Sequence, residues 1–120
     1  MKAELKYLHS PEIFDLAHFE PKNRKSFSFL LQIMVGPKGE EGEESFEVEV
    51  CTPRWLASNF DEERVILGSS YLIVQGYSYE KLKEFIIKYL DHCTGDNWLE
   101  VARKVSRLGQ WEFENYIFEK

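Results

Sequence analysis

Three adjacent side chains in the C-terminal half of the chain carry the chemistry of a nucleophilic site. Asp91, His92 and Cys93 place a carboxylate, an imidazole and a thiol in succession, and an activated cysteine uses these groups in catalysis. Consecutive residues of a helix, however, point about 100° apart, so sequence neighbours do not face one another. The alternative is a helix end, where the dipole favours His92 and Cys93 packs inside. We favour this alternative and predict no catalytic residues.

The motifs for metals and phosphate groups are also absent from the sequence. The three histidines are His9, His18 and His92. None of them has the spacing of a zinc ligand pair. The glycines of residues 36–42 precede neither a helix nor a Lys-Ser/Thr pair, so they do not form a phosphate loop. The acidic stretch that follows lacks the ligand order of a calcium loop. We therefore expect no metal and no cofactor.

An acidic run in the middle of the chain is the most unusual feature of the sequence. Six glutamates occur within ten residues: Glu40, Glu41, Glu43, Glu44, Glu47 and Glu49. Their mutual repulsion disfavours the compact state, so the run either keeps the protein soluble or meets a basic partner.

Near the C-terminus, aromatic and acidic side chains alternate. The four residues are Trp111, Glu112, Phe113 and Glu114. Aromatic side chains beside carboxylates can anchor an interface with a basic protein, and they can equally form the buried face of a last strand. Together with the six glutamates, these residues are the candidate contacts with a partner.

Length and composition limit the class of protein. A chain of 120 residues with 43% hydrophobic and 30% charged residues is typical of a globular protein with one domain, residues 1–120. The net charge of −6 argues against nucleic acid and anionic membranes as partners. No apolar run approaches the roughly 18 residues of a membrane span, and no signal peptide is recognisable. We expect a cytoplasmic protein in which Cys51 and Cys93 are free, buried thiols.

Alternating apolar residues predict the sheet. Strands are expected over residues 2–8, 27–35 and 45–52, and the last two form a long hairpin around the turn at 36–42. On the second hairpin strand, the apolar residues face the core while Glu47 and Glu49 face water.

Helical spacing dominates the second half of the chain. Thr52 and Pro53 are the N-cap and first residue of a short helix, and an apolar strand over residues 68–75 is placed inside the sheet. Two longer helices are expected, one over residues 79–92 with Ser78 as its N-cap and one from Asp96 onward. The apolar stripe of the first comprises Leu82, Phe85, Ile86, Tyr89 and Leu90.

We further expect Trp55 and Trp98 to belong to the core, and residues 110–118 to form a last strand. Strands followed by helices predict an α+β fold. The expected architecture is an antiparallel sheet of about four to five strands with two main helices packed on one face.

Several motifs, in their order and spacing, resemble the immunity protein 8 family of bacterial polymorphic toxin systems. They are the turn Gly36-Pro37-x-Gly39, the strand start Ser45-Phe46, the segment Cys51-Thr52-Pro53-x-Trp55-Leu56, and Trp111-Glu112-Phe113. The resemblance covers nearly the whole chain. It implies a small α+β antidote that is encoded beside a toxin, protects the producing cell by binding that toxin, and has no catalytic residues.

The leading hypothesis is therefore an immunity protein that binds a cognate toxin domain and occludes its active site. A basic, nuclease-type toxin suits the acidic surface, because complementary charge raises the association rate. Two alternatives stay open at this point. One is a small intracellular enzyme, and the other is an adaptor that adds a partner's strand to the hairpin edge.

Overall fold

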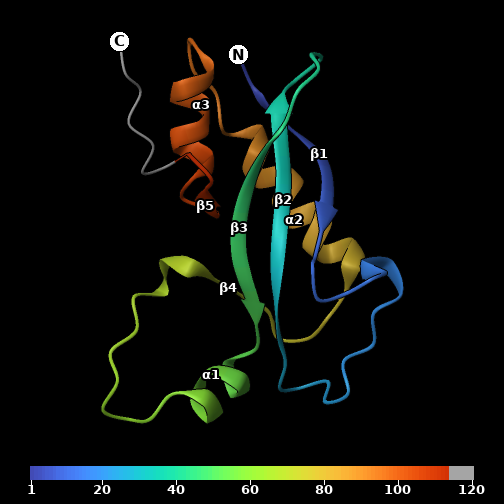
Figure 1. Ribbon diagram of the computed structural model, residues 1–120, viewed down its shortest axis with the longest axis vertical. Helices are drawn as coiled ribbons and strands as arrows, with labels where there is room; N and C mark the ends of the chain where they lie inside the picture. Colours follow the sequence, from blue (N-terminus) through green and yellow to red (C-terminus); the bar gives the residue numbers. More distant parts are fainter. Residues whose placement is uncertain (114–120) are drawn as a thin grey trace.

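The computed structural model describes residues 1–113 and shows one sheet with its two longest helices on one side of it (Figure 1). The strands are β1 (Ala3–His9), β2 (Ser28–Pro37), β3 (Glu44–Cys51), β4 (Tyr71–Ile73) and β5 (Gln110–Trp111). The α-helices are α1 (Pro53–Asn59), α2 (Tyr79–Asp91) and α3 (Trp98–Val105), with short 3-10 helices η1 (Leu16–His18) and η2 (Gly68–Ser70). The predicted α+β class is confirmed.

The long hairpin of β2 and β3 is the centre of the sheet. The strand order is β1-β2-β3-β4, and β5 joins β3 near the start of that strand. The pairs β1–β2, β2–β3 and β3–β5 are antiparallel, whereas β4 runs parallel to the end of β3. Because β2 pairs with β1 on one side and β3 on the other, its backbone hydrogen-bonding groups are satisfied along most of its length.

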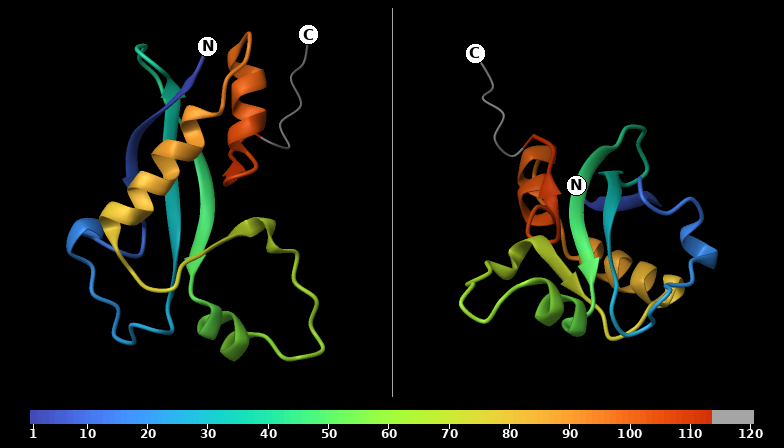
Figure 2. Two further views of the ribbon diagram at one scale, coloured as in Figure 1. Left: turned by 180° about the vertical axis from the view of Figure 1, so that it is seen from behind. Right: turned by 60° about the horizontal axis from the view of Figure 1, so that its bottom comes forward.

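Alternation along the hairpin separates a buried face from an open face. The buried side chains include Phe29, Leu31, Ile33, Phe46, Val48 and Val50. They pack against the apolar faces of α2 and α3. The left view of Figure 2, from behind, shows α2 crossing this face of the sheet.

No helix covers the opposite face of the sheet within the described residues, and this face is turned toward the viewer in Figure 1. We call it the open face. Directly paired residues place Tyr7, Met34 and Ser45 in one row across it, and His9, Gln32 and Glu47 in the next. Leu30 and Glu49 form a third row.

Side-chain caps begin α1 and α2 where the sequence predicts them, whereas α3 starts at Trp98 with Asn97 as its cap, slightly later than predicted. The hydroxyl of Thr52 accepts a hydrogen bond from the backbone N–H of Trp55 at 3.3 Å, with Pro53 in the first helical position. Ser78 caps α2 in the same way, through the N–H of Lys81. No helix within residues 1–113 is both long and apolar enough to span a bilayer.

The strand predicted over residues 68–75 is shorter and lies elsewhere than expected. Only Tyr71–Ile73 pair with β3, and they form the edge of the sheet rather than its interior. Between β3 and β4 the chain passes through α1 and a long loop, and β4 then pairs parallel to the last residues of β3. Apolar composition alone does not distinguish such an edge strand from a central one.

Three aromatic side chains are more exposed than their helical spacing predicts. Phe85 is 52% exposed and lines an apolar groove beside β4, although Leu82 and Ile86 on the same helix are buried. Trp55 is half-buried and packs edge-on against Phe60 outside the core cluster, so its assignment to the core is wrong. Trp98 is half-buried and packs against the core. Of the strand predicted over residues 110–118, Gln110 and Trp111 pair with β3, and the part after residue 113 lies outside the described residues.

We predict that Gly36→Ala destabilises the protein by about 1–3 kcal/mol, because an added methyl group overpacks the start of the hairpin turn. A Cβ atom at Gly36 would lie 2.0 Å from the carbonyl oxygen of Gly42, a backbone atom that cannot move aside. Gly68 has nothing within 4 Å of its Cβ position, so Gly68→Ala is the matched control and should leave stability nearly unchanged. Urea denaturation followed by circular dichroism measures both variants, and equal stability would contradict the prediction.

Candidate functional site

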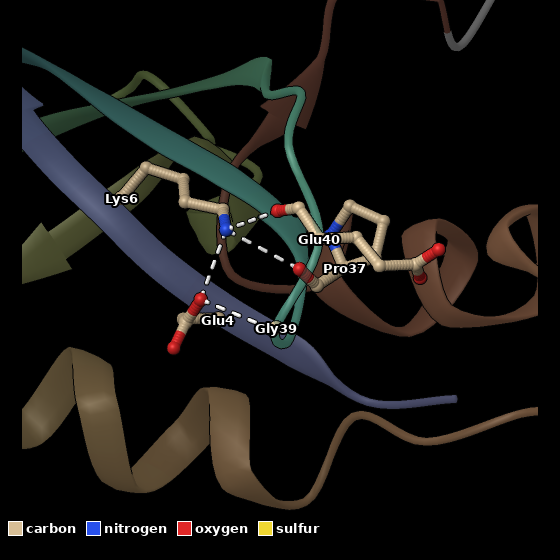
Figure 3. A network of polar contacts seen from close by, with 5 residues as sticks. All are labelled: Glu4, Lys6, Pro37, Gly39 and Glu40. Carbon is tan, nitrogen blue, oxygen red and sulfur yellow. Dashed lines mark hydrogen bonds and ion pairs between the residues drawn. The ribbon is translucent and has the colours of Figure 1, made fainter.

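Lys6 fixes the backbone of the acidic hairpin tip without neutralising its glutamates (Figure 3). Its Nζ donates to the carbonyl oxygens of Glu40 at 2.7 Å and Pro37 at 3.3 Å, and to the Glu4 carboxylate at 2.9 Å. The hydrogen bond from Lys6 lowers the pKa of Glu4, whose carboxylate also accepts from the backbone N–H of Gly39. Figure 3 shows the Glu40 carboxylate pointing away from Lys6. The tip is therefore rigid where Lys6 holds it, and its acidic side chains reach into solvent.

A chain of side-chain hydrogen bonds crosses the open face from β1 to β3. The Nδ1–H of His9 donates to Gln32 Oε1 at 2.7 Å, and Gln32 Nε2 donates to the Glu47 carboxylate at 3.0 Å. These three residues belong to one row of the sheet. These hydrogen bonds orient the exposed carboxylate of Glu47 on the open face. Its second oxygen is left free to accept a hydrogen bond from a partner.

Glu49 and Glu12 form a pair of like charges on the same face. Glu49 is half-buried, and its burial, followed by the negative charge of Glu12, raises the pKa of its carboxyl. Glu12 accepts a hydrogen bond from the backbone N–H of Leu30 at 3.3 Å. Among residues 1–113, no ion pair reaches either carboxylate. An added cation would offset both the cost of desolvating the Glu49 carboxylate and its repulsion by Glu12.

Tyr7 connects the hairpin tip to the open face. Its ring lies in the row of Met34 and is about half exposed. The negative charge of Glu43 raises the pKa of the Tyr7 phenol, whose hydroxyl hydrogen-bonds to that carboxylate. An exposed aromatic ring beside carboxylates is typical of a contact surface for a cationic protein.

Glu44, in contrast, belongs to the structural framework. Its Oε1 accepts the indole N–H groups of Trp98 at 2.6 Å and Trp111 at 3.0 Å. Trp111 is only 7% exposed, and its ring stacks on Phe46 at a centroid distance of 6.1 Å. Glu44 thereby joins the start of β3 to α3 and to β5. The Trp111 ring is therefore buried and packs against β3, so it is not available as a contact on the surface.

The remaining C-terminal candidates also attach to the hairpin. The Glu112 carboxylate accepts from the backbone N–H of Ser45 at 2.8 Å, and its own N–H donates to the Ser45 carbonyl. Phe113 packs edge-on against Trp111 at 5.9 Å. Glu114 lies outside the described residues. The structure thus attaches Trp111, Glu112 and Phe113 to the start of β3, beside Glu44.

The candidate surface, which we call the acidic face, combines the exposed tip with the open face of the sheet. It comprises Tyr7, Glu12, Glu40, Glu41, Glu43, Glu47 and Glu49. Sequence reasoning missed Tyr7 and Glu12 because each lies far along the chain from the acidic run. Simple alternation from Ala3 and Leu5 would place Tyr7 on the core face. A β-bulge between Leu5 and Tyr7 shifts the register and turns Tyr7 to the open face.

The side chains of Asp91, His92 and Cys93 do not assemble into a catalytic group. Asp91 forms an ion pair with Lys2 at 3.4 Å, His92 Nδ1 donates to the Lys88 carbonyl, and Cys93 donates to the Tyr89 carbonyl. Cys93 is 3% exposed, and burial raises the pKa of its thiol, which disfavours the thiolate. Both cysteines are free and buried, as predicted. Residues 1–113 contain no group of three or more His, Cys, Asp or Glu side chains arranged to hold a metal ion.

The fold and the acidic face define a small α+β protein with helices on one face of its sheet and carboxylates on the other. The chain belongs to the immunity protein 8 family, whose model matches residues 3–116. Membership in this family suggests an immunity protein and implies a toxin as its partner; immunity proteins are generally not enzymes. Neither a curated protein nor a solved structure matches the chain significantly.

We predict that Glu44→Ala lowers the free energy of unfolding by about 1–3 kcal/mol, because two indole N–H groups lose their shared acceptor. Glu47→Ala is the matched control on the same strand and should change stability by less than about 0.5 kcal/mol. Urea denaturation followed by tryptophan fluorescence reports both values. An equal effect of the two substitutions would contradict the structural role of Glu44.

We also predict that Glu49→Gln stabilises the protein at pH 7. A carboxyl whose pKa is raised on folding contributes stability that is present at low pH and lost as pH rises through the folded pKa. Removing the charge should therefore add roughly 0.5 kcal/mol at pH 7, a modest gain because solvent screens a half-exposed group. The gain should vanish near pH 3, where Glu49 is protonated and residue 49 is neutral in the parent protein as well as in the variant. Glu62→Gln, in an exposed turn, is the control; a gain of equal size at both pH values would contradict the assignment.

Proposed function

We propose that this protein is a cytoplasmic immunity protein that neutralises a cognate toxin domain by binding it stoichiometrically through the acidic face. Family membership supports a toxin as the partner. The observation that carries the choice of surface is a set of carboxylates on the open face that no ion pair reaches among residues 1–113. The partner surface is accordingly basic, as in toxin domains that act on nucleic acid, and binding occludes the toxin's active site.

The physical advantage of this surface is twofold. Exposed carboxylates at the hairpin tip attract a cationic domain over a distance and raise the association rate. The half-buried Glu49, which Glu12 repels, then gains a cation on docking and keeps the complex together. The repulsion between Glu12 and Glu49 lowers the stability of the free protein, and neutralisation by the partner removes this cost in the complex. Tyr7 and Met34 supply apolar contact area between the charges.

The most direct test of the proposed activity is co-expression with the toxin domain encoded beside the gene. Expression of the toxin domain alone should arrest growth, and the protein should restore it and co-purify with the toxin in a one-to-one complex. Cys93→Ala and His92→Gln should protect equally well. Loss of protection by either variant, while it still folds and binds the toxin, would instead favour an enzymatic mechanism.

We predict that neutralising the acidic face slows association with the toxin domain by about tenfold or more at low salt. The variant carries glutamine at Glu41, Glu43, Glu47 and Glu49, and leaves Glu44 intact for folding. Its association rate should also depend less on salt, because fewer charges remain to be screened. Stopped-flow mixing at low and moderate salt measures both effects.

A control variant separates the position of the charges from the net charge. It carries glutamine at Glu62, Glu63, Glu80 and Glu84, four exposed residues of the 60–70 loop and α2. Both variants change the net charge equally, but the control should retain most of the association rate. If the two variants associate equally fast, the acidic face serves solubility and the toxin binds elsewhere.

A further inference from the structure

An apolar groove lies at the opposite end of β3 from the acidic tip. It has a volume of about 790 Å³ and opens between β4, the first half of α2 and the segment 19–24. Its apolar lining includes Phe19, Leu72, Val74, Leu82 and Phe85. Ile73 and Phe85 are 53% and 52% exposed. Large apolar side chains are therefore presented to solvent around a concave surface, which is typical of a binding site.

The edge of β4 beside this groove offers unpaired backbone groups. The N–H of Val74 donates to the carbonyl of Cys51 at 2.8 Å, so the peptide groups of Leu72 and Val74 turn toward β3. In a strand the next residue turns the other way, so the N–H and C=O of Ile73 point away from β3. No strand pairs with this edge within residues 1–113. Such an edge is a template for a further strand.

The charge around the groove differs from that of the acidic face. Arg24 and Lys81 line it together with Glu20, so cations outnumber the one carboxylate in a chain whose net charge is −6. Arginine and lysine bind carboxylates through charge-assisted hydrogen bonds. The occupant of the groove is therefore expected to carry a negative charge, whereas the partner of the acidic face carries positive charge.

We propose that this groove binds an extended, acidic segment of a partner polypeptide, which adds to β4 as a further strand. Its backbone pairs with Ile73, and its alternate apolar side chains enter the groove beside Phe85. A carboxylate of the segment lies against Arg24 and Lys81. Strand addition of this kind combines affinity from the backbone with specificity from side-chain pockets. The proposal does not depend on the toxin-binding role of the acidic face.

A phage-displayed library of random 12-residue peptides, selected on the immobilised protein, tests the proposal. Selected peptides should alternate apolar residues and contain Asp or Glu. Phe85→Ser should weaken the binding of a selected peptide at least tenfold, and the double variant Arg24→Gln, Lys81→Gln should abolish the preference for acidic peptides. Ile87→Ser is the control, because Ile87 is an exposed apolar residue of α2 that does not line the groove.

Amide hydrogen exchange distinguishes strand addition from mere filling of the groove. Exchange at the Ile73 N–H should slow when the selected peptide is added. Failure to enrich any peptide, binding that survives the Phe85→Ser change, or an unchanged Ile73 exchange rate would each overturn the proposal. A concentration-dependent dimer that Phe85→Ser dissolves in sedimentation velocity would also overturn it, and would assign the groove to a second copy of the chain.

Discussion

The alternation of side chains along β2 and β3 is the constraint on which the rest of the structure depends. The side chains of Leu31, Ile33, Val35, Phe46 and Val50 have no exposed surface. Because successive residues of a strand point to opposite faces, a register slip of one residue would move this entire set into water. The two helices can cover only the apolar face, so the intervening carboxylates remain on the open one. The position of Glu47 and Glu49 on the acidic face is thus a direct consequence of the hairpin's register.

The acidic run is chemically heterogeneous despite its uniform composition. Glu44 accepts two indole N–H groups and joins the hairpin to α3 and β5, while Glu47 and the tip glutamates project into solvent. Glu49 is intermediate, since it is half-buried beside a like charge. One glutamate therefore stabilises the fold, and the others leave a field of negative charge that a basic partner would neutralise.

The features that could be predicted from the sequence are those that local patterns determine. Period-two alternation predicted the hairpin and its two faces, and the cap residues Thr52 and Ser78 predicted the starts of α1 and α2. Features that depend on distant contacts were missed. The edge position of β4, the exposure of Phe85 and the attachment of Trp111 to Glu44 each depend on where another element packs. The spacing of residues along the chain does not predict such contacts between distant elements.

Methyl cross-saturation in the complex with the neighbouring toxin domain tests the central claim most directly, because it maps the docking surface without altering any residue. Leu30 and Met34 carry methyl groups on the open face, whereas Ile87 and Leu99 are exposed on α2 and α3. Saturation of an unlabelled toxin domain should attenuate the signals of Leu30 and Met34 and spare those of Ile87 and Leu99. Attenuation of the two helical residues with unchanged signals at Leu30 and Met34 would contradict docking on the acidic face.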